Sequence, residues 1–196
     1  MKTITKQYQI YDFDELSEEA QEKVLNDNYD INIDYEWWQD DDIYQEIAKD
    51  YGIFIDIKEV SFSLDRENYV AFDTFNHSRS EKWSLPIYIK DYKLFFKKAG
   101  LNTNLKRVKT EIDNQNINID HTHYAGGIIA NYIKDDYADI TEEELEMLET
   151  CLNNMLDEIK SQLKLEYNDL TSKESIIDTI EANEYTFLEN GTMFNI

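Results

Sequence analysis

The chain has 196 residues, with 42 Asp and Glu against 19 Lys and Arg, so its formal net charge at pH 7 is −23. This charge disfavours direct binding to nucleic acid and to anionic membranes, because their phosphates would be repelled. A 41% share of hydrophobic residues and a 13% share of aromatic residues exclude a fully disordered acidic chain. The single cysteine, Cys151, allows no internal disulfide, and the first residues lack the apolar core of a secretion signal, so we expect a cytoplasmic protein.

The charge is distributed unevenly along the chain. Residues 12–59 and 135–196 each carry a net charge of −14, whereas residues 79–109 carry +7. Two interpretations are open. The basic middle can pack beside an acidic end and relieve self-repulsion, or the molecule can present one large acidic face to a basic partner.

The N-terminal third predicts a strand followed by two helices. Residues 3–13 alternate between polar and apolar side chains, as a strand does. Residues 14–29 have apolar positions at fourfold spacing and predict a helix that Ser17 or Asp14 can cap. Residues 36–51 predict the second helix.

The middle of the chain predicts two hairpins with a helix between them. Gly52 ends the preceding helix, in the position that favours a left-handed residue. Residues 53–75 alternate around the turn sequence DREN and predict the first hairpin. A helix is expected from Pro86 to Gly100, and two alternating runs within 105–124 predict the second hairpin around DNQN.

Two capping boxes predict helix starts in the C-terminal third, because the Thr hydroxyl and the Glu carboxylate each satisfy an unpaired backbone N–H. The first box, Thr141 with Glu144, opens a long amphipathic helix at about 142–167. The second box, Thr171 with Glu174, opens a short helix.

The last residues, 184–194, predict two strands around an Asn-Gly turn. Taken together, the elements predict a single α+β domain over 1–196, in which small antiparallel sheets of hairpins pack with amphipathic helices. The segment 79–130 is a candidate basic insertion subdomain.

Three stretches carry a resemblance to a known family: YDFDELSEEAQEKVLNDNYDINIDYEWW at 11–38, VSFSLDRENYVAF at 60–72 and YNDLTSKESIIDTIEANEYTFLENGTMF at 167–194. They resemble small acidic proteins of phages, prophages and other mobile elements, which are often named hypothetical proteins or antitoxins of a toxin–antitoxin stability system. The resemblance implies a genomic setting and no catalytic motif. Accessory proteins of phages often inhibit host defence, including CRISPR nucleases.

Rows of carboxylates on the first two predicted helices form the main candidate site. Helix residues three or four positions apart lie about 5–6 Å apart at Cβ, which is similar to the spacing of phosphates along a DNA strand. The rows can therefore imitate DNA, although a merely solvated surface is the simpler interpretation. The candidate partner-binding residues are Glu15, Glu18, Glu19, Glu22, Asp40, Asp41, Asp42 and Glu46.

The adjacent tryptophans Trp37 and Trp38 complete this candidate site. Neighbouring helix residues point about 100° apart, so one ring can be buried while the other is peripheral. Both can close the domain, or one can be an exposed anchor for a partner, since Trp is frequent in binding hot spots.

No catalytic residues and no cofactor are predicted. Asp120, His121 and His123 are weak metal candidates, because His121 and His123 share one face of a predicted strand, but a structural zinc site needs four ligands. Cys151 lies on an apolar helix stripe in acidic surroundings, which raises a thiol pKa and favours an inert core cysteine.

These observations lead to the expectation of a non-enzymatic inhibitor from a phage or mobile element. It would bind a basic nucleic-acid-binding surface of a host defence protein, in the manner of an anti-CRISPR protein that mimics DNA. The alternative is an antitoxin that neutralises a cognate toxin by direct binding. A metal-binding protein or an enzyme is a distant third.

Overall fold

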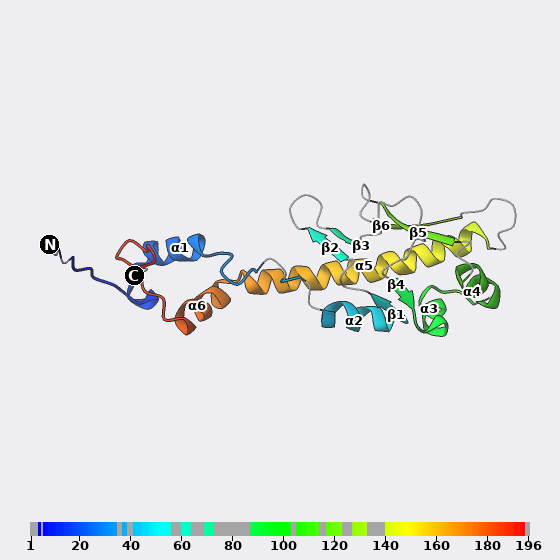
Figure 1. Cartoon of the computed structure of the whole chain (residues 1–196), viewed down its shortest axis with the longest axis horizontal. Coiled ribbons are helices and arrows are strands. Elements are labelled where there is room, and N and C mark those ends of the chain that lie inside the picture. Colours follow the sequence, from blue (N-terminus) through cyan, green and yellow to red (C-terminus); the bar gives the residue numbers. More distant parts are fainter. Residues whose placement is uncertain are drawn as a thin grey trace. The chain divides into compact units, whose positions relative to one another are not determined.

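The computed structural model divides the chain into two compact units (Figure 1). The terminal unit joins residues 1–37 and 164–196, and the central unit comprises residues 38–163. The sequence predicted one domain, with 79–130 as an insertion, whereas that segment lies inside the central unit. The structure describes residues 4, 6–34, 37–38, 41–55, 60–63, 69–72, 87–102, 105–113, 117–122, 127–132 and 140–194.

The terminal unit packs three short helical elements around one apolar core. They are the 3-10 helix η1 (Phe13–Glu15), α1 (Glu18–Asp27) and α6 (Lys173–Ala182). Ser17 caps α1 by accepting a hydrogen bond from the N–H of Ala20, as one of the two predicted caps. The buried core residues of this unit are Phe13, Leu16, Ala20, Val24, Ile176, Ile180 and Phe187.

Backbone pairing in the terminal unit is limited to two isolated bridges. Phe187 pairs with Tyr11 on one side and with Met193 on the other. Gly191, at φ 77°, makes the turn between the last two segments, as the Asn-Gly sequence predicted, but regular strands do not form there. The predicted strand at 3–13 is also wrong for its described residues, because only Tyr11 forms a β-bridge and Phe13 belongs to the 3-10 helix η1.

In the central unit, the helix α2 (Asp41–Asp50) leads through Gly52 into β1 (Ile53–Ile55). Gly52 has φ 72°, which confirms the left-handed residue expected after this helix. β1 pairs with β4 (Ile87–Ile89), so residues 53–55 do not belong to the hairpin predicted over 53–75. The helix predicted from residue 86 begins later, as α3 (Tyr92–Lys98), and ends at Gly100 as expected.

Two further antiparallel pairs belong to the central unit. β2 (Val60–Ser63) pairs with β3 (Tyr69–Phe72) around DREN, as predicted, and β5 (Ile117–Thr122) pairs with β6 (Gly127–Tyr132). The first half of the predicted hairpin at 105–124 is instead the helix α4 (Leu105–Asp113). The run LKRVKTEI fits both periods, and burial of Val108 and Glu111, three positions apart, favours the helix.

The longest helix, α5 (Glu142–Leu170), supplies the core of the central unit. Its capping box is confirmed, because the Thr141 N–H donates to the Glu144 carboxylate and the Glu144 N–H donates to the Thr141 hydroxyl. In Figure 1, α2, β1, β4 and α3 lie along one side of α5, and β2, β3, β5 and β6 along the other. The buried apolar residues of α5 are Leu145, Leu148, Cys151, Leu152, Met155, Leu156, Ile159 and Leu163.

The second predicted capping box does not form. Ser172 caps α6 by accepting from the N–H of Ser175, while the hydroxyl of Thr171 donates to the carbonyl of Tyr167. Thr171 lies too early for the cap because α5 extends to Leu170, three residues beyond the predicted end.

The described residues are mostly helical, with short antiparallel pairs of two strands each. This arrangement is only loosely compatible with the expected α+β class, because the described pairs do not join into a larger sheet. Among the described residues, no helix is both long and apolar enough to span a bilayer.

Candidate functional site

The first carboxylate row is present and exposed on the terminal unit. Glu18, Glu19 and Glu22 lie on α1 and Glu15 on η1, and all four are exposed. Glu15 also caps η1, since its carboxylate accepts a hydrogen bond from the N–H of Asp12 at 3.1 Å. The α1 row follows an N-cap, where the positive end of the helix dipole stabilises carboxylates.

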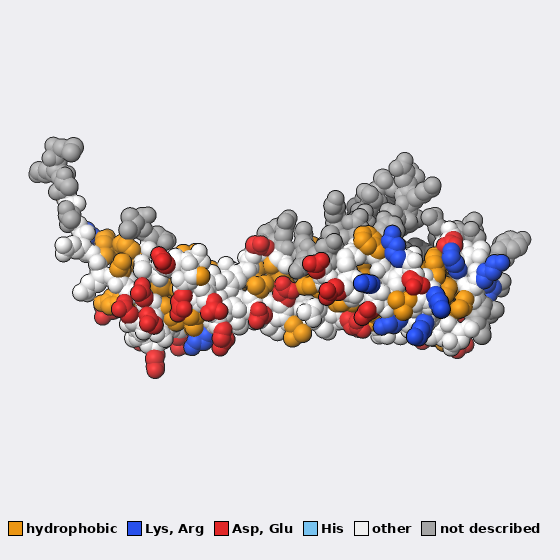
Figure 2. Space-filling view, turned by 90° about the horizontal axis from the view of Figure 1, so that it is seen from below, with side chains coloured by type: hydrophobic (Ala, Val, Ile, Leu, Met, Phe, Trp, Pro, Cys, Tyr) orange, Lys and Arg blue, Asp and Glu red, His pale blue; other side chains and the backbone are white. Residues whose placement is uncertain are grey.

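Few cations accompany the acids of the terminal unit. It contains 17 Asp and Glu against 5 Lys, a net charge of −12. Lys23, the one base on α1, is paired with Asp27 at 2.5 Å. Figure 2 shows acidic side chains gathered over the described surface of this unit. The exposed acids on its two main helices and adjoining turns are Asp14, Glu15, Glu18, Glu19, Glu22, Asp27, Asp30, Asp34, Asp169, Glu174, Asp178, Glu181, Glu184 and Glu189.

The second predicted row lies in the other unit. Asp42 and Glu46 are exposed on α2 of the central unit, whereas Asp40 and the side chain of Asp41 lie outside the described residues. The two rows were predicted as one face. The structure assigns them to separate units, so the candidate site is reduced to the row on the terminal unit.

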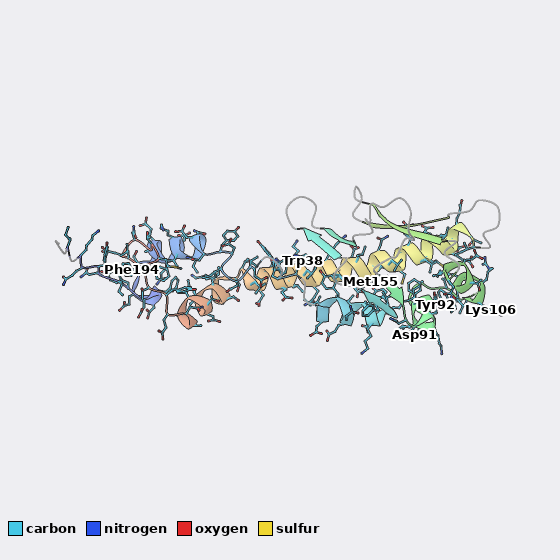
Figure 3. The ribbon with its side chains drawn as sticks, in the orientation of Figure 1. Trp38, Asp91, Tyr92, Lys106, Met155 and Phe194 are labelled. Atoms are coloured by element: carbon cyan, nitrogen blue, oxygen red, sulfur yellow. The ribbon has the colours of Figure 1, made fainter. Side chains whose placement is uncertain are left out.

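The boundary between the units falls between the two tryptophans. Trp37 is half-buried in the terminal unit, where its ring lies 5.5 Å from that of Tyr167, centroid to centroid. Trp38 belongs to the central unit and is also half-buried (Figure 3). Neither ring is fully exposed. This favours the interpretation that both rings pack within the fold over the interpretation that one is an exposed anchor for a partner.

Basic residues between positions 90 and 109, within the basic segment identified from the sequence, form a lysine-rich surface on the central unit. It is formed by α3 and α4, where Tyr92 and Lys106 come from neighbouring helices (Figure 3), and basic side chains gather there in Figure 2. Three of its lysines lie over aromatic rings at 4.3–5.2 Å from the centroid. These pairs are Lys90 with Phe54, Lys98 with Tyr51 and Lys109 with Tyr92.

One cation of this segment is fixed by a largely buried ion pair. Both carboxylate oxygens of Glu144 accept from one guanidinium nitrogen of Arg107, at 2.7 and 2.8 Å. Burial alone would raise the pKa of Glu144, but hydrogen bonds from Thr141 and Arg107 outweigh it and hold that pKa below its ordinary value. The pair joins α4 to the start of α5, which supports in part the interpretation that basic residues of the middle segment offset acidic ones.

Replacement of Glu144 by Gln should destabilise the central unit by about 1–3 kcal/mol at pH 7, because a charge-assisted bond to a shielded Arg is lost. Since the folded pKa of Glu144 is lowered, its contribution is complete above the ordinary pKa of 4.5 and is lost as pH falls through the folded value. Urea unfolding at pH 7 and at pH 3 measures both effects.

Glu143→Gln is the matched control, because Glu143 is exposed on the same helical turn. It should change the free energy of unfolding by no more than about 0.5 kcal/mol. Equal losses in the free energy of unfolding for the two variants would contradict the assigned role of the pair. So would a Glu144→Gln variant whose stability changes between pH 7 and pH 3 by as much as that of the wild-type protein.

Groups with reactive chemistry are few in the described part of the chain. Cys151 is buried, and burial raises the pKa of its thiol to about 11, which agrees with the predicted inert cysteine. The described residues contain no group of three or more His, Cys, Asp and Glu that could hold a metal ion. The metal candidates Asp120, His121 and His123 lie outside this search, because their side chains are not among those described.

Comparison with known proteins adds no relative. No family model, no curated protein and no solved structure matches the chain.

Proposed function

We propose that the protein is a non-enzymatic inhibitor from a phage or other mobile element, and that it binds a basic nucleic-acid-binding surface of a host defence protein. A CRISPR effector nuclease is the partner we favour, which places the site of action in the bacterial cytoplasm. The observation that carries the proposal is the exposed row of Glu18, Glu19 and Glu22 on a unit with a net charge of −12.

The row has the properties that a phosphate mimic needs. In the described part of the chain these three carboxylates accept no hydrogen bond and form no ion pair, so their charge is available to a partner. Like charges three or four positions apart destabilise a helix by about 0.2–0.5 kcal/mol per pair, so the row has a cost in stability. Binding to a basic groove would turn that repulsion into attraction and would accelerate encounter.

The test measures displacement of a labelled DNA duplex from a guide-loaded CRISPR effector. The variant Glu18→Lys, Glu19→Lys, Glu22→Lys should weaken displacement by about tenfold to a hundredfold, since three exposed pairs are each worth about 0.2–1 kcal/mol and become repulsive. Affinity of the wild-type protein should fall as salt rises, because exposed charges are screened.

The matched control is Glu142→Lys, Glu143→Lys, Glu146→Lys on α5. Its three residues are also exposed and occupy the same first, second and fifth positions of their helix. Both variants have a net charge of −17, and both lose the same favourable contact with a helix dipole. The control should weaken displacement by less than about threefold, because its row lies on the other unit.

Three results would contradict the proposal. Equal weakening of displacement by both variants would show that the net charge of the protein, and not the position of the row, causes the displacement. Failure of the wild-type protein to displace nucleic acid from any effector would exclude a DNA mimic. Tight neutralisation of a small basic toxin encoded beside the gene would favour the antitoxin instead.

A further inference from the structure

The N-terminal segment, residues 4 and 6–10, exposes an unusual share of apolar surface. Ile4, Tyr8 and Ile10 are 91%, 50% and 48% exposed, and all three occupy even positions. Elsewhere in the described chain, only Tyr29 and Leu165 among the large hydrophobic residues are as exposed as Ile10, while Phe54 and Leu105 are exposed to a smaller extent. The segment therefore presents one apolar row to its surroundings.

The segment already has the side-chain alternation of a β-strand. The ammonium of Lys6 lies 4.7 Å from the ring centroid of Tyr8, and the hydroxyl of Tyr11 donates to the Gln9 amide oxygen. Each contact joins residues two apart, as on one face of a strand. Only Tyr11 has a backbone partner, Phe187, so the backbone groups of 6–10 are without one in the described chain.

An extended segment with unpaired backbone groups is suited to pairing with another strand. Two copies of this segment, antiparallel and centred on Gln7, would place Ile4 opposite Ile10 and Lys6 opposite Tyr8. The two isoleucines then meet each other, and the lysine–tyrosine contact present within one chain recurs between chains.

Other registers are less favourable. Centring on Lys6 places two ammonium groups opposite each other, and like charges directly opposite are destabilising. Centring on Tyr8 places Lys6 opposite Ile10 and Ile4 opposite Asp12. A register centred between two residues sets the apolar row against the polar one, because successive side chains alternate between faces. Centring on Gln9 would place Lys6 opposite Asp12, but Asp12 is the N-cap of η1 and lies outside the segment. Within residues 4–10, Gln7 is the centre that gives a self-complementary pattern.

We propose that the N-terminal segment is a self-association surface whose partner is the same segment of a second copy, paired antiparallel about Gln7. The pairing supplies each backbone with the hydrogen bonds that the single chain lacks and covers Ile4, Tyr8 and Ile10. It forms more readily in higher salt, because each terminal unit carries a net charge of −12 and two copies repel. The inference does not depend on the proposed function.

The test compares disulfide formation in the full-length variants Gln7→Cys and Gln9→Cys. Residues directly opposite in an antiparallel pair have Cα atoms about 4.5–5.5 Å apart, within disulfide range, whereas position 9 and its copy would lie about 14 Å apart. Under mild oxidation, Gln7→Cys should form a covalent dimer at least about tenfold faster than Gln9→Cys. The wild-type protein is the background control, because Cys151 is buried and the pKa of its thiol is raised to about 11.

Light scattering provides the second measurement. The wild-type protein should show a concentration-dependent dimer in 0.5 M salt, and Gln7→Pro should abolish it, because proline fixes φ at about −65°, far from the about −140° of an antiparallel strand. Circular dichroism should confirm that Gln7→Pro remains folded, since Gln7 is exposed. A wild-type monomer at every concentration, a dimer that survives Gln7→Pro, or equal oxidation rates at positions 7 and 9 would overturn the proposal.

Discussion

Phe187→Ala should destabilise the terminal unit by about 3–5 kcal/mol and leave the central unit nearly unchanged. The ring of Phe187 is fully buried, in one cluster with Phe13, Val24 and Ile180. Removing the ring leaves a cavity in the cluster that joins α1 to α6, two helices distant in sequence. A unit of this size has little stability in reserve, because small units bury a small fraction of their surface. Hydrogen exchange should therefore show lost protection in peptides from α1 and α6 but not in those from the first half of α5.

Leu148→Ala is the reciprocal control for the two-unit organisation. Leu148 is fully buried on α5 within the central unit, and its truncation should cost about 2–5 kcal/mol there. Protection should then fall around α5 and persist in α1 and α6. If both variants lose protection throughout the chain, the two units unfold as one, and the single domain predicted from the sequence describes the protein better.

Gly52→Ala should destabilise the central unit by about 2–5 kcal/mol, through backbone strain and a steric clash. Gly52 has φ 72°, which costs a residue with a Cβ about 1–2 kcal/mol. A Cβ at this position would also lie 2.5 Å from the carbonyl oxygen of Asp91 and 3.2 Å from the N of Phe95. Those are backbone atoms at the start of α3 and cannot rotate away. Urea titration followed by circular dichroism measures the loss.

Gly100→Ala separates the strain from the clash. Gly100 has nearly the same conformation, φ 77°, but a Cβ there would meet no heavy atom within 4 Å among the described residues beyond its chain neighbours. The expected cost is therefore the strain alone, about 1–2 kcal/mol. If both substitutions cost the same, the close approach of Gly52 to α3 would not contribute to stability.

Amphipathic helices were the part of the fold that could be predicted from sequence. The apolar stripe and the Thr141–Glu144 box located α5 to within three residues, because caps and helical periodicity depend on neighbours in the chain. Gly52 was predicted as a left-handed residue for the same reason, since such a residue after a helix is a local requirement, and Gly100 was predicted as the end of its helix.

Strand pairing could not be predicted in the same way. β1 pairs with β4, more than 30 residues away, rather than with β2, which follows it. The alternation of residues 3–13 is typical of a strand. A strand also needs a neighbouring strand to pair with, and in the described chain Tyr11 alone of this segment has one, in Phe187. Residues 105–113 fit both the helical period and the alternation of a strand, and the burial of Val108 favours the helix.

The sequence by itself determined the acidic composition, the helical carboxylate row on α1 and the inert environment of Cys151. The first two depend on composition and on spacing within one helix, and Cys151 is inert because the apolar stripe that carries it is buried. Only the tertiary structure decided that the row on α1 and the acids of α2 belong to different units, and that Arg107 is held by Glu144. Both facts depend on contacts between residues distant in the chain, which local periodicity does not encode. The stretches 11–38 and 167–194 fall almost wholly within the terminal unit, because its core is built from both ends of the chain.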